Sequence, residues 1–298
     1  MTTWEGKSRG KVIGYKIFEW SLKYLGLDFG YFLLLFVSAY FVFASKKAFR
    51  SIFYYFHNRL HFNRLKSLTS IFRNYYLFGQ VIIDKTVILG GFKNKIKLNL
   101  EGKEFLLQMK NGGILISGHI GNWEVGGQVL DFMEKKINVL VFDAERQAIK
   151  NYMSEVLSDR LVSFISIGDD YSHLMEMKKV LANKEIIAMH GDRFVSGNKT
   201  IMIDFLGEPA PFPLGPWLLA SYFKVPVSYV FAIKESRKSY RFFATPIKMV
   251  PYTRNPSHRE EILINSMKEY VYELEKIVKN YPLQWYNYYD FWMKKENN

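Results

Sequence analysis

A histidine and a carboxylate stand five residues apart, at His119 and Glu124, where an apolar stretch gives way to a glycine-containing turn. If His119 lies in the turn and Glu124 in the first turn of a helix, the carboxylate can hold one ring N–H of the imidazole. Such a contact fixes the tautomer and makes the other ring nitrogen a better base toward a hydroxyl proton. The pair therefore predicts general-base catalysis. The alternative is a buried histidine with a structural hydrogen bond.

The elements around this pair are predicted to bring a second group close to it. Ile114–Ser117 has the apolar character of a short buried strand that ends just before His119. Asp192 and Arg193 follow another apolar strand, Ile186–Met189, in the same way. Parallel sheets place ligands at the carboxyl ends of their strands, so both loops are expected to face the site. The alternative for Asp192 and Arg193 is a surface ion pair of little energetic value.

The rest of the chain alternates strand and helix patterns, which predicts an α/β fold with a layered, mostly parallel sheet flanked by helices. Phe205–Pro216 contains four prolines and is expected to be a rigid loop, either a connector or a wall of the substrate site. The predicted strands are 81–83, 114–117, 137–142, 164–167, 186–189, 227–233 and 240–244. The predicted helices are 122–134, 146–159, 170–182, 216–223 and 259–279, the last with one apolar stripe for the core.

The N-terminal region differs from the rest in character. Tyr31–Ala44 carries no charge, but it is short for a span, because a helix needs ~20 apolar residues to cross the hydrocarbon core. Ile13–Leu27 precedes it with an amphipathic pattern, and Lys46, Lys47 and Arg50 follow it. We predict a membrane-anchoring region over residues 1–60 and an α/β domain over 61–298. Monotopic attachment is favoured over a single pass, and a buried core helix is the other alternative.

Composition limits the chemistry. The chain has 298 residues and no cysteine, which excludes disulfides and a cysteine nucleophile. It has no phosphate-binding glycine loop, no His-Glu-x-x-His zinc site and no Gly-x-Ser-x-Gly nucleophile elbow, so we predict neither metal nor cofactor. The formal net charge of +13 favours acidic partners. Because no nucleic-acid-recognition motif is present, these are expected to be lipids or an acidic protein.

The segment Gly118–Glu124, with its Gly-Asn-Trp-Glu, resembles the bacterial lipid A late acyltransferases, lysophospholipid-acyltransferase-like enzymes with a His-x4-Asp/Glu motif. Three further stretches resemble this family in the same order: Gly191–Arg193, Phe205–Ala210 and Tyr281–Tyr286. The chain departs from the family at Arg193, where glutamine is common. The resemblance covers roughly residues 5–292.

The resemblance implies a membrane-associated O-acyltransferase of the bacterial inner membrane that faces the cytoplasm. The acyl donor would be acyl carrier protein or acyl-coenzyme A, and the acceptor a hydroxyl of an anionic glycolipid or phospholipid, in the first place a lipid A precursor. His119 and Glu124 would be catalytic, and the expected substrate contacts are Asn122, Arg160, Asp192 and Arg193. Arg193 and backbone N–H groups after His119 suit an oxyanion. A lysophospholipid, aminolipid or glycosylated-lipid acceptor and a non-catalytic lipid-binding protein are the alternatives.

Overall fold

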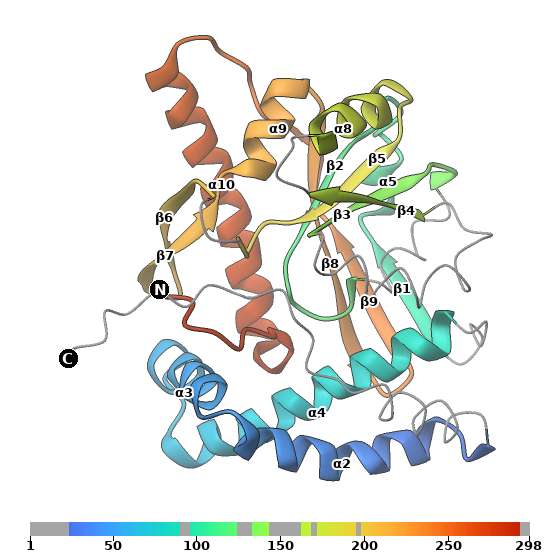
Figure 1. Cartoon of the computed structure of the whole chain (residues 1–298), viewed down its shortest axis with the longest axis vertical. Helices are drawn as coiled ribbons and strands as arrows, with labels where there is room; N and C mark the ends of the chain where they lie inside the picture. Colours follow the sequence, from blue (N-terminus) through green and yellow to red (C-terminus); the bar gives the residue numbers. More distant parts are fainter. Residues whose placement is uncertain are drawn as a thin grey trace.

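A central sheet with helices on its faces organises the chain (Figure 1). The computed structural model describes residues 24–89, 96–123, 133–142, 162–167, 172–194 and 198–292. Glu124, Arg160 and the predicted helix 146–159 therefore lie outside the described residues, as do most of the predicted helix 122–134 and most of the amphipathic segment 13–27.

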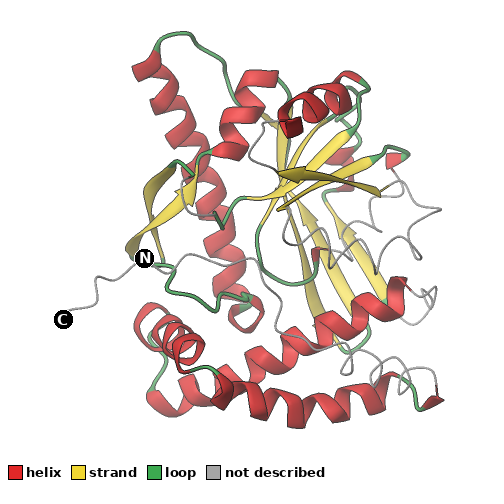
Figure 2. Cartoon of the chain, viewed as in Figure 1, coloured by secondary structure: helices red, strands yellow, loops and turns green. Residues whose placement is uncertain are grey.

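The main sheet has the strand order β1-β9-β8-β2-β5-β3-β4, with β10 beside β8. Figure 2 shows its strands in yellow with helices around them. Five neighbouring strands, from β8 to β4, run parallel, whereas β9 is antiparallel to β8. The predicted α/β fold with a mostly parallel sheet is confirmed. The strands are β1 (Lys97–Glu101), β2 (Gly113–Ser117), β3 (Ile137–Phe142), β4 (Val162–Ile167), β5 (Ile186–His190), β8 (Pro226–Ser236), β9 (Ser239–Ala244) and β10 (Lys248–Met249).

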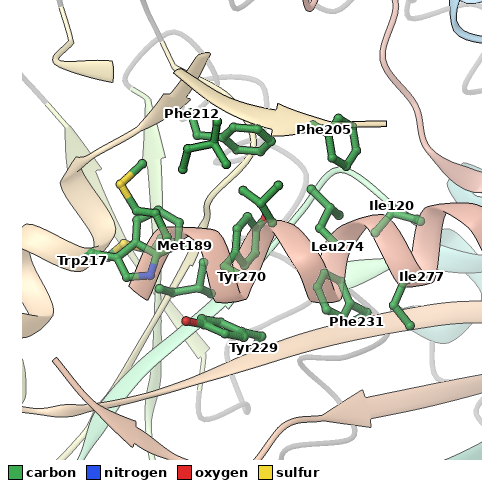
Figure 3. Packing of buried hydrophobic residues seen from close by; sticks show 14 of the residues in the cluster. Ile120, Met189, Phe205, Phe212, Trp217, Tyr229, Phe231, Tyr270, Leu274 and Ile277 are labelled. Atoms are coloured by element: carbon green, nitrogen blue, oxygen red, sulfur yellow. The ribbon is translucent and has the colours of Figure 1, made fainter. Parts of the chain in front are cut away.

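Strand β2 is buried along its whole length, which explains its unbroken apolar sequence. One side of the sheet is covered by α10 (Pro256–Asn280), whose first turn is capped by the Asn255 side chain. Tyr270, Leu274 and Ile277 of α10 pack against Phe231 of β8 (Figure 3). The stripe predicted for this helix is confirmed as core contact, because its members Met267, Val271, Leu274 and Val278 are buried. The smaller helices near the sheet are α5 (Lys103–Leu106), α8 (Ser172–Ala182), α9 (Gly215–Phe223) and the 3₁₀ turn η4 (Pro282–Gln284).

Two sequence predictions are wrong. Val81–Ile83 is not a strand but part of the long helix α4 (Arg64–Leu89), where Val81 and Ile83 are buried; packing outweighs the β propensity of branched residues. Phe205–Pro216 is not a loop throughout, since β6 (Thr200–Phe205) and β7 (Glu208–Pro213) form a hairpin. The prolines at 209, 211 and 213 alternate, so their missing N–H groups lie on one edge of β7 and leave the ladder to β6 intact.

The N-terminal helices lie together along one end of the sheet (Figure 1). Helix α2 (Leu27–Ala44) runs beside α4, and α3 (Lys46–Tyr54) continues through the π-helical turn η1 (Tyr55–Arg59) toward α4. Among the described residues, α2 is the helix long and apolar enough to cross a membrane. It is not separate from the α/β part of the chain, because its inner face packs on α4.

A buried polar cluster joins α2 and α4 to the sheet. The carboxylate of Asp84 on α4 accepts hydrogen bonds from the hydroxyls of Tyr31 and Tyr240 and from the Lys234 ammonium. Lys234 Nζ also donates to Tyr31 Oη at 3.0 Å and to the Arg237 carbonyl at 3.3 Å. All four side chains are buried, and they come from α2, α4, β8 and β9. A buried ion pair is tolerated only when its remaining hydrogen-bonding capacity is satisfied, as it is here.

Removing one partner of this cluster should be strongly destabilising. We expect Asp84→Ala to lower the free energy of unfolding by about 3–5 kcal/mol, because the Lys234 charge is left buried and unpaired. Replacing both partners, as Asp84→Leu with Lys234→Met, should recover much of that loss. Chemical unfolding followed by tryptophan fluorescence measures both. The matched control is Asp28→Ala, which breaks the exposed Asp28–Arg237 pair and should cost at most about 1 kcal/mol. Equal losses for Asp84→Ala and Asp28→Ala would contradict this account of the cluster.

Candidate active site

The loop after β2 holds His119 in one backbone position. The His119 carbonyl accepts from Tyr286 N at 2.9 Å, and Gly121 N donates to the Gln284 carbonyl at 2.9 Å. Asn122 N donates to the Ala232 carbonyl of β8 at 2.7 Å. The loop is therefore fixed between the C-terminal segment on one side and the sheet on the other. The N–H groups of Gly121 and Asn122 are used in these bonds and are not available to an oxyanion.

Gly121 is needed for this arrangement. Its φ of +66° lies in the left-handed region, and a Cβ there would stand 1.9 Å from the Ala232 carbonyl oxygen. Any other residue would push the loop away from β8. This explains in physical terms why the turn after His119 carries a glycine.

Asp192 is the carboxylate that contacts the His119 ring. Asp192 Oδ1 lies 2.7 Å from His119 Nδ1, and Asp192 Oδ2 accepts from the His119 backbone N at 2.8 Å. The indole Nε1 of Trp285 donates to the same Oδ2 at 3.3 Å. The His119 side chain is 22% exposed, whereas that of Asp192 is 1% exposed. The imidazole is thus within reach of a substrate, and the carboxylate that orients it is not.

The Asp192 carboxylate stays ionised. Burial alone would raise its pKa, but the charge of His119, the hydrogen bond from it and the charge of Arg193 together hold the pKa of Asp192 below its usual range. An ionised carboxylate only accepts hydrogen bonds, so the neutral His119 ring carries its proton on Nδ1. Nε2 is left with a lone pair, which is what a general base requires.

A second histidine packs on the first. The rings of His119 and His190 have centroids 4.2 Å apart and are tilted by 36°, and Trp123 meets His190 edge-on at 5.6 Å. His190 Nδ1 is buried without a hydrogen-bond partner. Burial, followed by the charge of His119, lowers the pKa of His190 well below its usual range. His190 is therefore neutral, and it adds no charge that would oppose protonation of His119.

Among the described residues, His119, His190 and Asp192 are the group whose geometry could suit a metal ion, with ligand atoms within 4.8 Å of one another. Two of these three already bond to each other, through His119 Nδ1 and Asp192 Oδ1. The sequence predicts no metal and no cofactor, and both stay predictions.

The structure brings four of the six predicted site residues into one region. Asn122 is fully buried, and its Nδ2 donates to the Val81 carbonyl of α4 at 3.3 Å, so it ties the loop to that helix. Arg193 donates to the Tyr286 carbonyl and lies over the Tyr289 ring. Asp192, which was expected only to face the site, bonds directly to the His119 ring. Glu124 and Arg160 lie outside the described residues, so their roles stay predictions.

Sequence reasoning missed the way in which the C-terminal segment builds the site. Trp285 holds Asp192, and the Gln284 side chain bonds both to the backbone N of Lys234 at 2.9 Å and to its carbonyl at 2.7 Å. Asp192 itself was expected at a strand end, and the pairing of the strands explains why it meets His119. Ser117 of β2 pairs with His190 of β5, and His119 and Asp192 each lie two residues beyond that pair.

Comparison with known proteins identifies a family for the chain. The family model described as bacterial lipid A biosynthesis acyltransferase matches residues 73–295, which include all of the site residues. Among solved structures, the 1-acyl-sn-glycerophosphate (LPA) acyltransferase PlsC from Thermotoga maritima is similar at 15% identity and a TM-score of 0.39, over 82% of this chain and 95% of that one. A likeness at this level carries no conclusion about function. No curated protein matches the chain. On the family match, the chain belongs to the bacterial lipid A biosynthesis acyltransferases.

Proposed function

We propose that this protein transfers a fatty acyl chain from an acyl thioester to a hydroxyl of a lipid acceptor, in the first place a lipid A precursor. The observation that carries the proposal is the His119–Asp192 contact, in which a buried, ionised carboxylate holds Nδ1 of a partly exposed imidazole. Family membership supplies the reaction class. The donor is acyl carrier protein or acyl-coenzyme A, and the site of action is the cytoplasmic side of a bacterial inner membrane.

In the proposed mechanism, His119 Nε2 removes the proton of the acceptor hydroxyl while its oxygen attacks the thioester carbonyl. The tetrahedral intermediate then expels the thiolate, which takes the proton back from the imidazolium. Asp192 stabilises the imidazolium formed between these two steps and keeps Nε2 pointed outward. No covalent acyl-enzyme is involved.

The remaining predicted residues have supporting roles in the proposal. Glu124 keeps its predicted role of stabilising the imidazolium by its negative charge, whereas Asp192 bonds to Nδ1. Arg193 lies beside Asp192 and contributes positive charge near the developing oxyanion, and Arg160 binds a substrate phosphate. The net charge of +13 attracts the acidic donor and an anionic acceptor.

Substitution of the pair tests the mechanism. We expect His119→Ala and Asp192→Asn each to slow acyl transfer by ~10²–10⁴-fold, the range that general-base catalysis supplies. The double variant should be little slower than either single one, because the two residues act as a unit. Glu124→Gln should also be severely slowed. Thermal melting of each variant is the control for folding. A folded His119→Ala protein that transfers acyl chains at the wild-type rate would overturn the mechanism.

The pH profile gives a second test. Activity should fall toward acid pH because His119 loses its lone pair, and log kcat/KM should fall by about one unit per pH unit. The slope should stay near one because the pKa of His190 lies well below its usual range, so His190 does not titrate with His119. His190→Phe should keep this slope, and Asp192→Asn should move the acid limb to lower pH, because a charge that favours the imidazolium is lost. A limb with a slope near two, reduced to one by His190→Phe, would contradict the assignment.

The acceptor can be identified directly. Mass spectrometry of total lipids from cells with the wild-type protein, with His119→Ala and with neither should show one lipid class that gains an acyl chain only with the wild-type protein. A gain on a lysophospholipid or an aminolipid would replace lipid A precursor as the acceptor. A lipid profile that is identical in all three would contradict the transferase proposal.

A further inference from the structure

Helix α2 has two opposite faces with different surroundings. Tyr31, Leu34 and Ser38 lie on one face and are buried. Five aromatic residues recur at steps of three and four along the other face and are 36–83% exposed: Phe29, Phe32, Phe36, Tyr40 and Phe43. Steps of three and four place them in one stripe along the helix. Exposed aromatic surface of this extent marks an interaction site.

The buried face is held to the protein along most of the helix. Near the start of α2, Tyr31 binds Asp84 in the buried polar cluster. In the middle, Leu34 packs so closely on Gly79 of α4 that a Cβ at Gly79 would meet its Cδ2 at 2.7 Å. Near the end, the ring of Phe41 stacks on that of Tyr75 at 6.2 Å. These contacts fix α2 alongside α4 rather than leaving it as a detached anchor (Figure 1).

The sequence around the stripe is positively charged. Residues 29–83 contain seven lysines and arginines and no aspartate or glutamate. Lys46, Lys47 and Arg50, immediately after α2, are exposed, as are Arg64 and Lys66 at the start of α4. An exposed aromatic stripe next to basic residues matches an anionic bilayer surface, where apolar rings enter the boundary of head groups and acyl chains.

We propose that α2 lies in the plane of the membrane, with its aromatic stripe in one leaflet and its opposite face clamped on α4. This inference rests on the proposed membrane association and specifies its geometry. Eighteen residues of helix reach about 27 Å at 1.5 Å per residue, and one whole side of α2 is occupied by protein. To cross the bilayer, α2 would have to move away from α4. This movement would separate Tyr31 from Asp84 and Lys234.

The arrangement also relates the membrane to the active site. Helix α4 contacts α2 on one side, and on another it accepts the Asn122 side chain through the Val81 carbonyl. The loop that contains His119 therefore contacts α4, and α4 in turn packs against α2, the helix proposed to face the membrane.

Depth measurements test this geometry without using activity. The chain has no cysteine, so Phe29→Cys, Phe36→Cys and Phe43→Cys can each carry one environment-sensitive fluorophore. With vesicles of phosphatidylethanolamine and phosphatidylglycerol, quenching by spin-labelled lipids should report the same shallow depth at all three positions. Lys178→Cys, on the exposed face of α8, is the control and should not be quenched.

A depth that changes steadily from position 29 to position 43 would overturn the proposal in favour of a spanning helix. Absence of quenching at all three positions would also overturn it, and light scattering would then show whether a second copy covers the stripe. Because no acyl transfer is measured, these outcomes are independent of the outcome for His119.

Charge substitutions provide a second test with a matched control. Phe32→Glu with Phe36→Glu should weaken binding to the same vesicles at least tenfold, because two rings lose their burial. Acylation of an acceptor presented in detergent should be unchanged. Met175→Glu with Tyr222→Glu places two charges on exposed apolar residues of α8 and α9 and should leave vesicle binding unchanged. Equal vesicle binding by the two double variants would contradict the proposal.

Discussion

The carboxylate of Asp192 is the group on which the geometry of the site depends. It accepts hydrogen bonds from the backbone and the ring of His119 and from the indole of Trp285, so three segments far apart in the chain meet on two oxygen atoms. It is almost completely buried, and a buried charge is stable only with partners of this kind. The same contacts that stabilise the buried charge of Asp192 therefore fix the orientation of the imidazole.

The C-terminal segment and α4 connect this site to the rest of the fold. Gln284 and Tyr286 bond to the backbone of the His119 loop, and Asn74 of α4 donates to the carbonyls of Leu283 and Trp285. Helix α4 also carries Asp84, to which Tyr31 of α2 binds. The His119 loop, the C-terminal segment and α2 are thus parts of one packed unit. In the proposed geometry, a bilayer that binds α2 lies against this unit.

The sequence predicted those features of the fold and the site that depend on local pattern. Apolar runs found six of the strands, and the placement of His119 and Asp192 after two of them was sufficient to expect both in one site. The contact of Asp192 with the His119 ring was not predictable from spacing, because Asp192 is 73 residues away and the motif pointed to the nearby Glu124, whose role stays a prediction. Val81–Ile83 was assigned to a strand because branched residues favour strands locally, and only the packing of α4 overrides that preference. The prediction of a loop at the proline-containing hairpin was wrong for the opposite reason. Prolines generally indicate loops, and they are compatible with a strand only when they alternate along one edge.

In the proposed site, Asp192 holds the proton of His119 on Nδ1 and leaves Nε2 as the base. Nitrogen-15 NMR of the protein labelled at its six histidines tests this directly, with the His119 signal assigned by its loss in His119→Gln. We predict that above the pH at which His119 protonates, its Nδ1 carries the proton, its Nε2 does not, and Asp192→Asn disturbs this preference. A neutral His119 with its proton on Nε2, unchanged by Asp192→Asn, would contradict the account.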